Sequence, residues 1–217
     1  GEIDLVVGGP PCQGFSTLGD KLSCDPRNNL FDSFADMVSI LKPKYLLMEN
    51  VKAMTTMYGG QFKDYVIQKF SDLGYDVSYV VLNAAEYGVP QNRERVFFFG
   101  TKENKSFSFP KKTHGEEKGM SPFETVDDWI MDIAGKENVI PNHIPLNHSE
   151  TVTRRYELIP EGGKLPSPEK LPKEIRRSNF GNTYKRLDRK KPSPTLVPGN
   201  NAFPVHPILD RSLTPRE

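Results

Sequence analysis

The sequence predicts an open α/β sheet followed by a loop-rich second domain. Short apolar runs alternate with amphipathic helical stripes over the first hundred residues. This regularity fades after residue 111, where proline, glycine and basic residues are scattered among short extended runs. The length of 217 residues is enough for one large domain or two small ones. We therefore expect one domain over residues 1–111, a second over 112–210, and the start of a return to the first over 211–217.

The expected sheet begins with a strand, a helix and a second strand. Residues 3–8 form an apolar run closed by glycines and prolines, which is typical of a buried strand. Apolar side chains then recur with helical spacing over residues 30–41, and Pro43 follows the end of this helix. Residues 45–48 form the second strand, which ends at the triplet Glu49-Asn50-Val51.

A second helix and two further strands complete this pattern. Apolar residues keep helical spacing over residues 62–73, and Gly74 stops the helix. Residues 77–82 and 95–100 form two strands, which the loop 86–94 joins. Because helices connect successive strands twice, the pattern indicates an open α/β sheet.

The second domain is expected to be irregular and basic. It contains one expected helix, near residues 125–133, and short extended runs such as 194–197. Residues 1–149 carry 15 basic and 20 acidic side chains, a net charge of −5, whereas residues 150–217 carry 14 and 8, a net charge of +6. This asymmetry indicates that one half of the chain contacts a polyanion. On charge alone, an ordinary solvated basic loop explains it equally well.

Composition excludes several classes of protein. The formal net charge is +1, far from that of a disordered polyelectrolyte. No apolar run approaches the roughly 18 residues of a membrane span, and no basic-then-apolar leader is present. Two cysteines separated by eleven residues form neither a disulfide framework nor a metal-binding knuckle. We expect a soluble protein of a reducing compartment, with no metal and no membrane contact.

Reactive side chains gather at the expected strand ends, where open α/β sheets bind ligands. Residues 10–16, 49–51 and 91–95 would bring a thiol, a carboxylate and two guanidinium groups to one rim if their strands are neighbours. Cys12 follows two prolines and precedes a nearby glycine. This setting favours an exposed, nucleophilic thiolate over a small buried side chain, which is the commoner fate of a cysteine.

Glu49, Arg93 and Arg95 are the other candidates on this rim. Glu49 ends an apolar strand, where burial favours a protonated carboxyl that donates a proton, although a cap for the following turn is an equal alternative. Taken alone, Arg93 and Arg95 fit a charged hairpin in water better than a binding site. The segments become specific only in combination.

In combination these segments resemble the DNA (cytosine-5-)methyltransferases. The resemblance implies a Rossmann-like, S-adenosylmethionine-dependent methyltransferase sheet with a small target-recognition domain, and methyl transfer to carbon 5 of cytosine in duplex DNA. It runs through nearly the whole chain in a fixed order. The motifs are Gly9-Pro10-Pro11-Cys12-Gln13-Gly14-Phe15-Ser16, Asp25-Pro26-Arg27-Asn28-Asn29-Leu30-Phe31, Glu49-Asn50-Val51, Tyr87-Gly88-Val89-Pro90-Gln91-Asn92-Arg93-Glu94-Arg95-Val96, Ile159-Pro160-Glu161-Gly162-Gly163, Arg186-Leu187-Asp188 with Pro192-Ser193-Pro194-Thr195, and Arg211-Ser212-Leu213-Thr214-Pro215-Arg216-Glu217.

The resemblance implies a catalytic role for each rim residue. Cys12 adds to carbon 6 of cytosine, which makes carbon 5 nucleophilic. Glu49 protonates or hydrogen-bonds ring nitrogen 3 and so stabilises the charge pushed into the ring. Arg95, supported by Arg93, binds the base or its phosphate and stabilises the thiolate.

The same resemblance implies how DNA is bound. Because this chemistry cannot reach a base inside a duplex, the cytosine must flip out. Residues 13–29 resemble the family's catalytic loop, and the basic domain resembles its target-recognition region, which neutralises phosphates and reads the major groove. The residues expected to bind DNA are Gln13, Ser16, Asn50, Gln91, Arg186, Thr195 and Leu196.

The family's cofactor, S-adenosylmethionine, sits on a glycine-rich turn, yet the 17 glycines of this chain include no Gly-x-Gly. Pro11 and Leu30 are expected to contact the cofactor. We interpret the chain as a fragment that binds the cofactor weakly and is inactive alone. Its exposed sheet edge invites a partner chain or self-association. The expected setting is double-stranded DNA in the bacterial cytoplasm, associated with the nucleoid, in a restriction–modification system.

Three other functions compete with this interpretation. The main alternative is a DNA-binding remnant or a subunit of a split methyltransferase. A glycine-rich turn encoded upstream would favour the enzyme, and a natural start codon near residue 1 would favour this alternative. An RNA cytosine-5 methyltransferase would use the same chemistry, but the second domain is long enough to read a duplex. A cysteine hydrolase would need a histidine base, and all four histidines lie in the second domain, away from Cys12.

Overall fold

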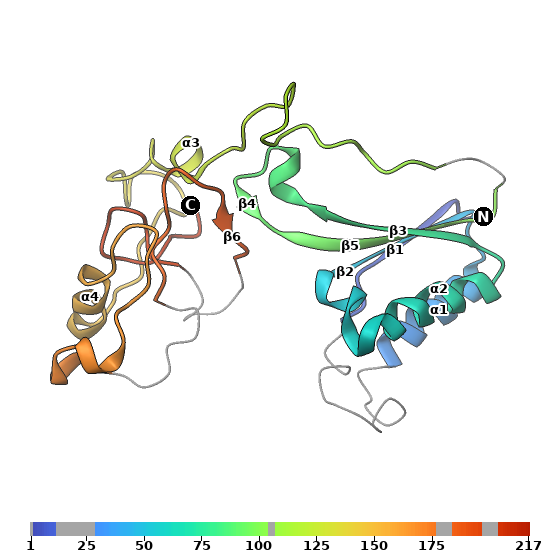
Figure 1. The fold of residues 1–217 in the computed structure, drawn as a ribbon, viewed down its shortest axis with the longest axis horizontal. Coiled ribbons are helices and arrows are strands. Elements are labelled where there is room, and N and C mark those ends of the chain that lie inside the picture. Colours follow the sequence, from blue (N-terminus) through green and yellow to red (C-terminus); the bar gives the residue numbers. More distant parts are fainter. Residues whose placement is uncertain (1, 12–28, 104–106, 177–183, 197–203) are drawn as a thin grey trace. The chain divides into compact units, whose positions relative to one another are not determined.

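A computed structural model of the chain describes residues 2–11, 29–103, 107–176, 184–196 and 204–217 (Figure 1). It divides into two compact units. Unit 1 contains residues 1–83 and 94–111, and unit 2 contains residues 84–93 and 112–217. The loop 84–93, which we expected in the first domain, groups with unit 2 because part of it pairs with a strand there.

Within its described residues, unit 1 forms a four-stranded sheet with two helices on one face (Figure 1). Each helix follows a strand in the chain, α1 (Asn29–Leu41) after the first and α2 (Gln61–Asp72) after the second. The first two strands are parallel, while the last strand is antiparallel to both of its neighbours. The predicted α/β fold class is confirmed. The strands in sheet order are β1 (Leu5–Gly8), β2 (Tyr45–Val51), β5 (Glu94–Thr101) and β3 (Asp76–Asn83).

The sheet and its helices enclose one aromatic-rich core. Alternate residues of β2 and β5 are buried, because successive side chains of a strand point to opposite faces. The helical stripes predicted from the sequence supply the other half of this core. Phe31 meets Phe70 edge-to-face, with ring centroids 5.8 Å apart. The core includes Phe31, Phe34, Val38, Leu46, Met48, Phe62, Val66, Phe70, Val96 and Phe98.

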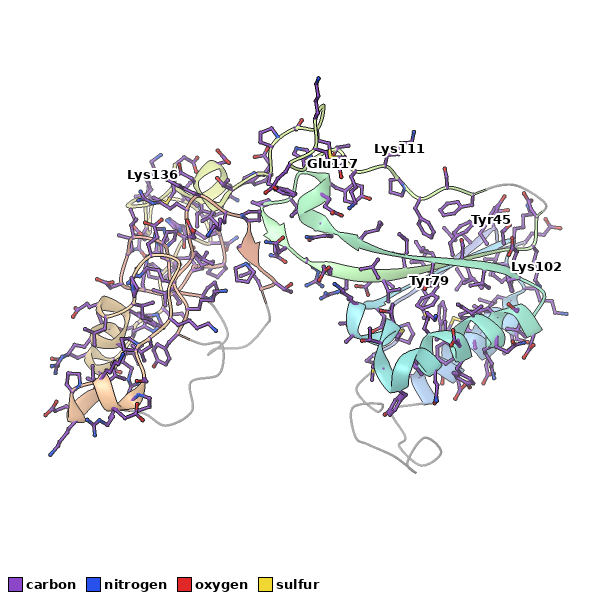
Figure 2. The ribbon with its side chains drawn as sticks, viewed as in Figure 1. Tyr45, Tyr79, Lys102, Lys111, Glu117 and Lys136 are labelled. Carbon is purple, nitrogen blue, oxygen red and sulfur yellow. The ribbon has the colours of Figure 1, made fainter. Side chains whose placement is uncertain are left out.

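The two faces of the sheet differ in how fully they are covered. Tyr79 lies on the face that α2 covers (Figure 2). It stacks on Phe98, and the Lys63 ammonium of α2 lies 5.4 Å from its ring centroid. Tyr45 alternates with buried Leu46 and stacks on Phe99. On this second face Phe107 stacks on Phe99 yet stays 45% exposed. The second face is therefore apolar but only partly covered within the described residues.

Unit 2 contains little regular structure. Strand β4 (Gln91–Asn92) pairs in parallel with β6 (Ser193–Pro194), and the helices are α3 (Val126–Ile130) and α4 (Glu150–Glu157). Helix α3, predicted near residues 125–133, begins with a capping box formed by Thr125 and Asp128. Helix α4 was not predicted, because only two of its eight residues are apolar.

Short 3-10 turns connect the longer elements. Among the described residues no helix is both long and apolar enough to traverse a lipid bilayer. The turns are η2 (Lys52–Thr55), η3 (Met57–Gly60), η4 (Ala84–Tyr87), η5 (Pro168–Lys170) and η6 (Lys173–Ile175).

Candidate active site

The carboxyl ends of β1 and β2 lie side by side in unit 1. The parallel register pairs Gly8 with Met48, so the backbone beyond Gly8 runs next to Glu49. A Cβ at Gly8 would lie 2.4 Å from a ring carbon of Phe34, and a Cβ at Gly9 would lie 3.3 Å from Oε2 of Glu49. The two glycines therefore allow the strand to pass close to α1 on one side and to the Glu49 carboxylate on the other.

Glu49 forms an ion pair with Arg95 at this end of the sheet. Arg95 Nε lies 3.0 Å from Glu49 Oε1, and Arg95 also donates through Nη1 to the carbonyl of Glu94 at 2.8 Å. The antiparallel register of β2 and β5 explains the contact, because Arg95 is paired with Val51, two residues after Glu49. The Arg95 side chain is 18% exposed and the Glu49 side chain 38%. Glu49 is therefore less buried than its position after an apolar strand led us to expect, and it is open to a ligand.

Asn50 is turned into the protein instead of toward a ligand. Its side chain is 6% exposed, and its Nδ2 donates to the carbonyl of Pro10 at 2.7 Å. Its Oδ1 accepts the backbone N–H of Val51 at 2.9 Å. The geometry differs from the DNA contact expected for Asn50, because both polar atoms already have partners within the protein.

Some of the other residues predicted for this rim lie outside the described residues, and others are exposed. Cys12, Gln13 and Ser16 lie outside the described residues. Pro11 is exposed, and so is Leu30 at the start of α1, with 46% of its surface accessible. Unit 1 thus brings Glu49 and Arg95 together, beside the backbone that leads directly to Cys12.

Unit 2 contains Arg93 and four of the residues expected to bind DNA, which are Gln91, Arg186, Thr195 and Leu196. Gln91 pairs with Ser193 in the β4–β6 ladder, and the Thr195 hydroxyl donates to the carbonyl of Asn92 at 2.7 Å. The threonine therefore fixes the chain next to Arg93. Leu196 is partly buried and packs against an apolar cluster of this unit, so its side chain contributes to internal packing. The cluster contains Val126, Ile130, Leu187 and Leu213.

Arg186 is a structural residue in this arrangement. Its side chain is buried, and all five of its N–H groups are used. The prediction that it binds DNA is not supported, because no N–H remains for a phosphate. We expected a DNA contact because Arg186 stands among other positively charged residues in the sequence, and this pattern does not indicate a structural role. The acceptors are the carbonyls of Tyr156, Ile159, His206 and Leu209 and the carboxylate of Asp210.

A second buried network joins the end of the chain to the rest of unit 2. Arg211 contacts Glu217 at 2.7 Å and Glu137 at 2.6 Å. Burial opposes ionisation of Glu217, but the hydrogen bonds from Arg211 and from the Thr214 backbone outweigh it and hold its pKa below the ordinary value. Burial lowers the pKa of His206 to about 4. These partners were not predicted, although the segment 211–217 was recognised as a motif.

A groove of about 680 Å³ on unit 2 is lined by several basic side chains. Lys185, Lys190 and Lys191 line it together with the hydroxyl-bearing Thr125. Lys191 forms an ion pair with Asp188 at 3.1 Å and is 74% exposed. The groove thus combines three ammonium groups with polar side chains and with the carboxylates of Glu116 and Asp188, and its lysines are the groups able to contact phosphates.

Among the described residues no group of three or more histidine, cysteine, aspartate or glutamate side chains forms a metal site. The chemistry available at the end of the sheet is that of one carboxylate and one guanidinium group beside a proline turn.

Comparison with known proteins identifies the relatives of this chain. It is 36% identical over 224 residues to the type II methyltransferase M1.HphI of Haemophilus parahaemolyticus and 35% identical to M.NgoFVII of Neisseria gonorrhoeae. Both matches cover 100% of this chain but only 58% and 59% of the relatives, so the chain spans about three-fifths of their length.

A solved structure supports the same relationship. A prophage-encoded E. coli protein assigned as a DNA modification methyltransferase matches with a TM-score of 0.67 and 26% identity, over 99% of this chain and 67% of that one. The family model for C-5 cytosine-specific DNA methylases matches residues 1–217. This chain therefore belongs to the family of C-5 cytosine-specific DNA methylases.

Proposed function

We propose that the protein containing this chain transfers a methyl group to carbon 5 of cytosine in duplex DNA, and that unit 1 supplies the groups that activate the base. The observation that carries this proposal is the pairing of Glu49 with Arg95 at 3.0 Å, at the end of the sheet. Gly9 and Pro10 lie against Glu49 and Asn50, and Cys12 follows two residues later. The acid and the cation therefore meet beside the segment that precedes the proposed nucleophile in the sequence.

The proposed reaction uses these residues in order. The Cys12 thiolate forms a bond to carbon 6, and the electron pair of the ring double bond moves toward carbon 5 and the carbonyl–nitrogen 3 system. Glu49 stabilises that charge by a hydrogen bond or a proton at nitrogen 3, and Arg95 fixes the carboxylate in place. Carbon 5 then takes the methyl group. Loss of the carbon 5 proton and departure of the thiolate restore the aromatic ring.

The methyl donor we propose is S-adenosylmethionine, which supplies the methyl group when bound. Pro11 and Leu30 fit an apolar part of such a ligand, because both are exposed at the end of the sheet that carries Glu49. Phe34, one turn after Leu30, packs beside Gly8, so the start of α1 belongs to this end of the sheet. The glycine-rich turn of the family is not in the sequence, so these residues would hold only part of the donor.

Duplex DNA is the proposed substrate, and unit 2 is its proposed reader. The net charge of +6 over residues 150–217 and the groove lined by Lys185, Lys190 and Lys191 support this assignment. A flipped cytosine is required, since within a duplex nitrogen 3 is held in the base pair and the faces of the ring are covered by stacked neighbours. The bacterial relatives support a cytoplasmic location on the nucleoid as part of the same proposal.

The test is methyl transfer by the full-length protein that contains this chain, measured in single turnover with radiolabelled S-adenosylmethionine. Cys12→Ser should abolish transfer while DNA binding persists. Glu49→Gln should slow transfer by about 10²–10⁴-fold, because the acid at nitrogen 3 is lost. Glu94→Gln is the matched control, since its exposed carboxylate pairs with Lys52 instead and should leave the rate unchanged.

Two results would overturn the proposal. Full activity of Cys12→Ser would remove the covalent mechanism, and an unchanged rate in Glu49→Gln would remove the acid. DNA binding with no transfer by the wild-type protein would favour a DNA-binding remnant or a subunit that needs a partner.

A further inference from the structure

We infer that Asn50 is a positioning residue for this reaction, which acts by fixing the backbone that carries Cys12. This inference rests on the proposed role of Cys12 as the nucleophile. Asn50 touches no reacting atom in the proposed scheme. Its side chain is 6% exposed and joins the end of β2 to the carbonyl of Pro10 at 2.7 Å, and Pro10 lies two residues before Cys12.

The Asn50 side-chain amide is needed here because the two prolines cannot donate backbone hydrogen bonds to β2. A parallel ladder is held by backbone N–H donors, and Pro10 and Pro11 have none. The pairing of β1 with β2 ends at Gly8. Beyond that point the carbonyl of Pro10 is the group through which the described segment is tied to β2, and Asn50 Nδ2 is its donor.

The orientation of the Asn50 amide is also fixed. Its Oδ1 accepts the backbone N–H of Val51 at 2.9 Å, so its NH₂ group must be the end that faces Pro10. An aspartate has nearly the same shape and keeps the acceptor for Val51, but its ionised carboxylate would face the Pro10 carbonyl without a donor. Asn50→Asp therefore tests the hydrogen bond separately from the packing.

The segment that leads to Cys12 in the sequence also passes close to the acid. Gly9 passes so close to Glu49 that an added Cβ would lie 3.3 Å from its Oε2. Glu49 is in turn held by Arg95. When Pro10 is released, the backbone that carries Cys12 is free to shift against an acid that stays in place. Misplacement of a reacting group by about 1 Å costs roughly 10²-fold in rate.

The experiment measures covalent trapping of the full-length protein on a duplex that contains 5-fluorocytosine at the target site, with S-adenosylmethionine present. Asn50→Ala and Asn50→Asp should each lower the trapping rate about 10²-fold, while the Kd for unmodified DNA stays within about twofold. The fall in rate without a fall in affinity separates positioning of Cys12 from loss of the fold.

Tyr75→Phe is the matched control. Tyr75 is also buried in unit 1, and its hydroxyl donates to the carbonyl of Pro43 at 2.7 Å, before the start of β2. Both substitutions remove a buried bond to a proline carbonyl, and Asn50→Ala also removes the acceptor of the Val51 N–H. Tyr75→Phe should therefore lower the thermal midpoint, and Asn50→Ala should lower it at least as much. Only the Asn50 variants should trap slowly.

The outcomes distinguish this inference from the function on which it rests. If the wild-type protein methylates DNA but never forms the trapped complex, the covalent role of Cys12 is wrong. If the wild-type protein traps and both Asn50 variants trap within about threefold of it, the positioning role of Asn50 is wrong. A Tyr75→Phe variant as slow as Asn50→Asp would also overturn it, because a general loss of stability would then explain both.

Discussion

The two units of this chain are stabilised in different ways. Unit 1 buries a continuous cluster of aromatic and aliphatic side chains between a sheet and two helices. The described residues of unit 2 form two small apolar clusters, and in the same unit Arg186 and Arg211 bond to buried carbonyls and carboxylates. The hydrophobic effect alone accounts for the first arrangement. The second depends on polar groups that are costly to bury unless every partner is present.

This difference matches the two tasks proposed for the protein. A rigid sheet end suits chemistry, because the acid and the nucleophile must keep a fixed separation. A loop-rich unit suits recognition of DNA, because loops carry different side chains on a shared framework. Buried Arg186 belongs to the framework in this case, and the lysines line a groove that is available to a ligand.

The largest effect on stability is expected in the core of unit 1. Phe70 is fully buried and packs edge-to-face on Phe31 and Phe34. Phe70→Ala should lower the free energy of unfolding of this unit by about 4 kcal/mol, because it removes transfer energy and leaves a cavity. Urea unfolding followed by hydrogen exchange of β2 and β5 measures this loss. A loss below about 1 kcal/mol would contradict the core assigned to unit 1.

The matching substitution in unit 2 is Arg186→Ala. It leaves four backbone carbonyls without their donors, and we expect a loss of about 3 kcal/mol in the free energy of unfolding. Arg189→Ala is the control, because Arg189 forms an exposed ion pair with Glu161 and its removal should change little. The comparison fails if Arg186→Ala folds as stably as the wild type and loses only DNA affinity, which is the outcome that a direct phosphate contact would give.

Acid should unfold unit 2 before unit 1. Burial lowers the pKa of His206 from 6.5 to about 4, so the unfolded chain binds more protons than the fold between these values. Glu217, whose pKa is also lowered, stabilises the fold above about pH 4.5, and this stabilisation is lost as the pH falls below that value. The stability of unit 2 is therefore complete above pH 6.5 and declines toward pH 4.

Fluorescence of Trp129, the single tryptophan of the chain, reports unit 2 in this experiment. His206→Asn is the informative variant, because an amide oxygen can replace Nδ1 as the acceptor for the N–H groups of Ile208 and Leu209. Its stability should depend less on pH between 6.5 and 4. Earlier loss of exchange protection in unit 1 than in unit 2 would contradict the expected order.

The smallest expected effect concerns the groove. Lys190→Ala should weaken DNA binding about equally for all sequences and reduce the slope of log Kd against log salt by about 1. Lys170→Ala, an exposed lysine of unit 2 outside the groove, is the control and should leave the slope unchanged. Equal effects of the two substitutions would show that the groove has no special part in binding.

Sequence patterns predicted unit 1 well because its elements follow hydrophobic periodicity. The stripes of α1 and α2 and the strands β2, β3 and β5 were each expected within a few residues of their observed bounds. Helix α4 escaped prediction because its sequence is polar and its stability comes from Tyr156 and Arg155, which are buried by segments distant in the chain. Tertiary contacts of this kind leave no local period.

The candidate site shows the same limit. Glu49 and Arg95 were predicted together, and the sheet register brings them into contact. Asn50 and Arg186 were expected to face DNA, yet both are buried and bonded to backbone carbonyls. A polar residue type gives no sign of its own burial. For Arg186 the neighbours Tyr184 and Leu187, which are buried themselves, could have indicated it.

The most direct test of the account is peptide mapping of the complex formed by the full-length protein on a 5-fluorocytosine duplex in the presence of S-adenosylmethionine. We predict one base-bearing peptide, with the modification on Cys12, and no complex with Cys12→Ser. Attachment at another residue, or methylation of ordinary DNA by a protein that forms no such complex, would contradict the assignment of Cys12, Glu49 and Arg95 to one catalytic site.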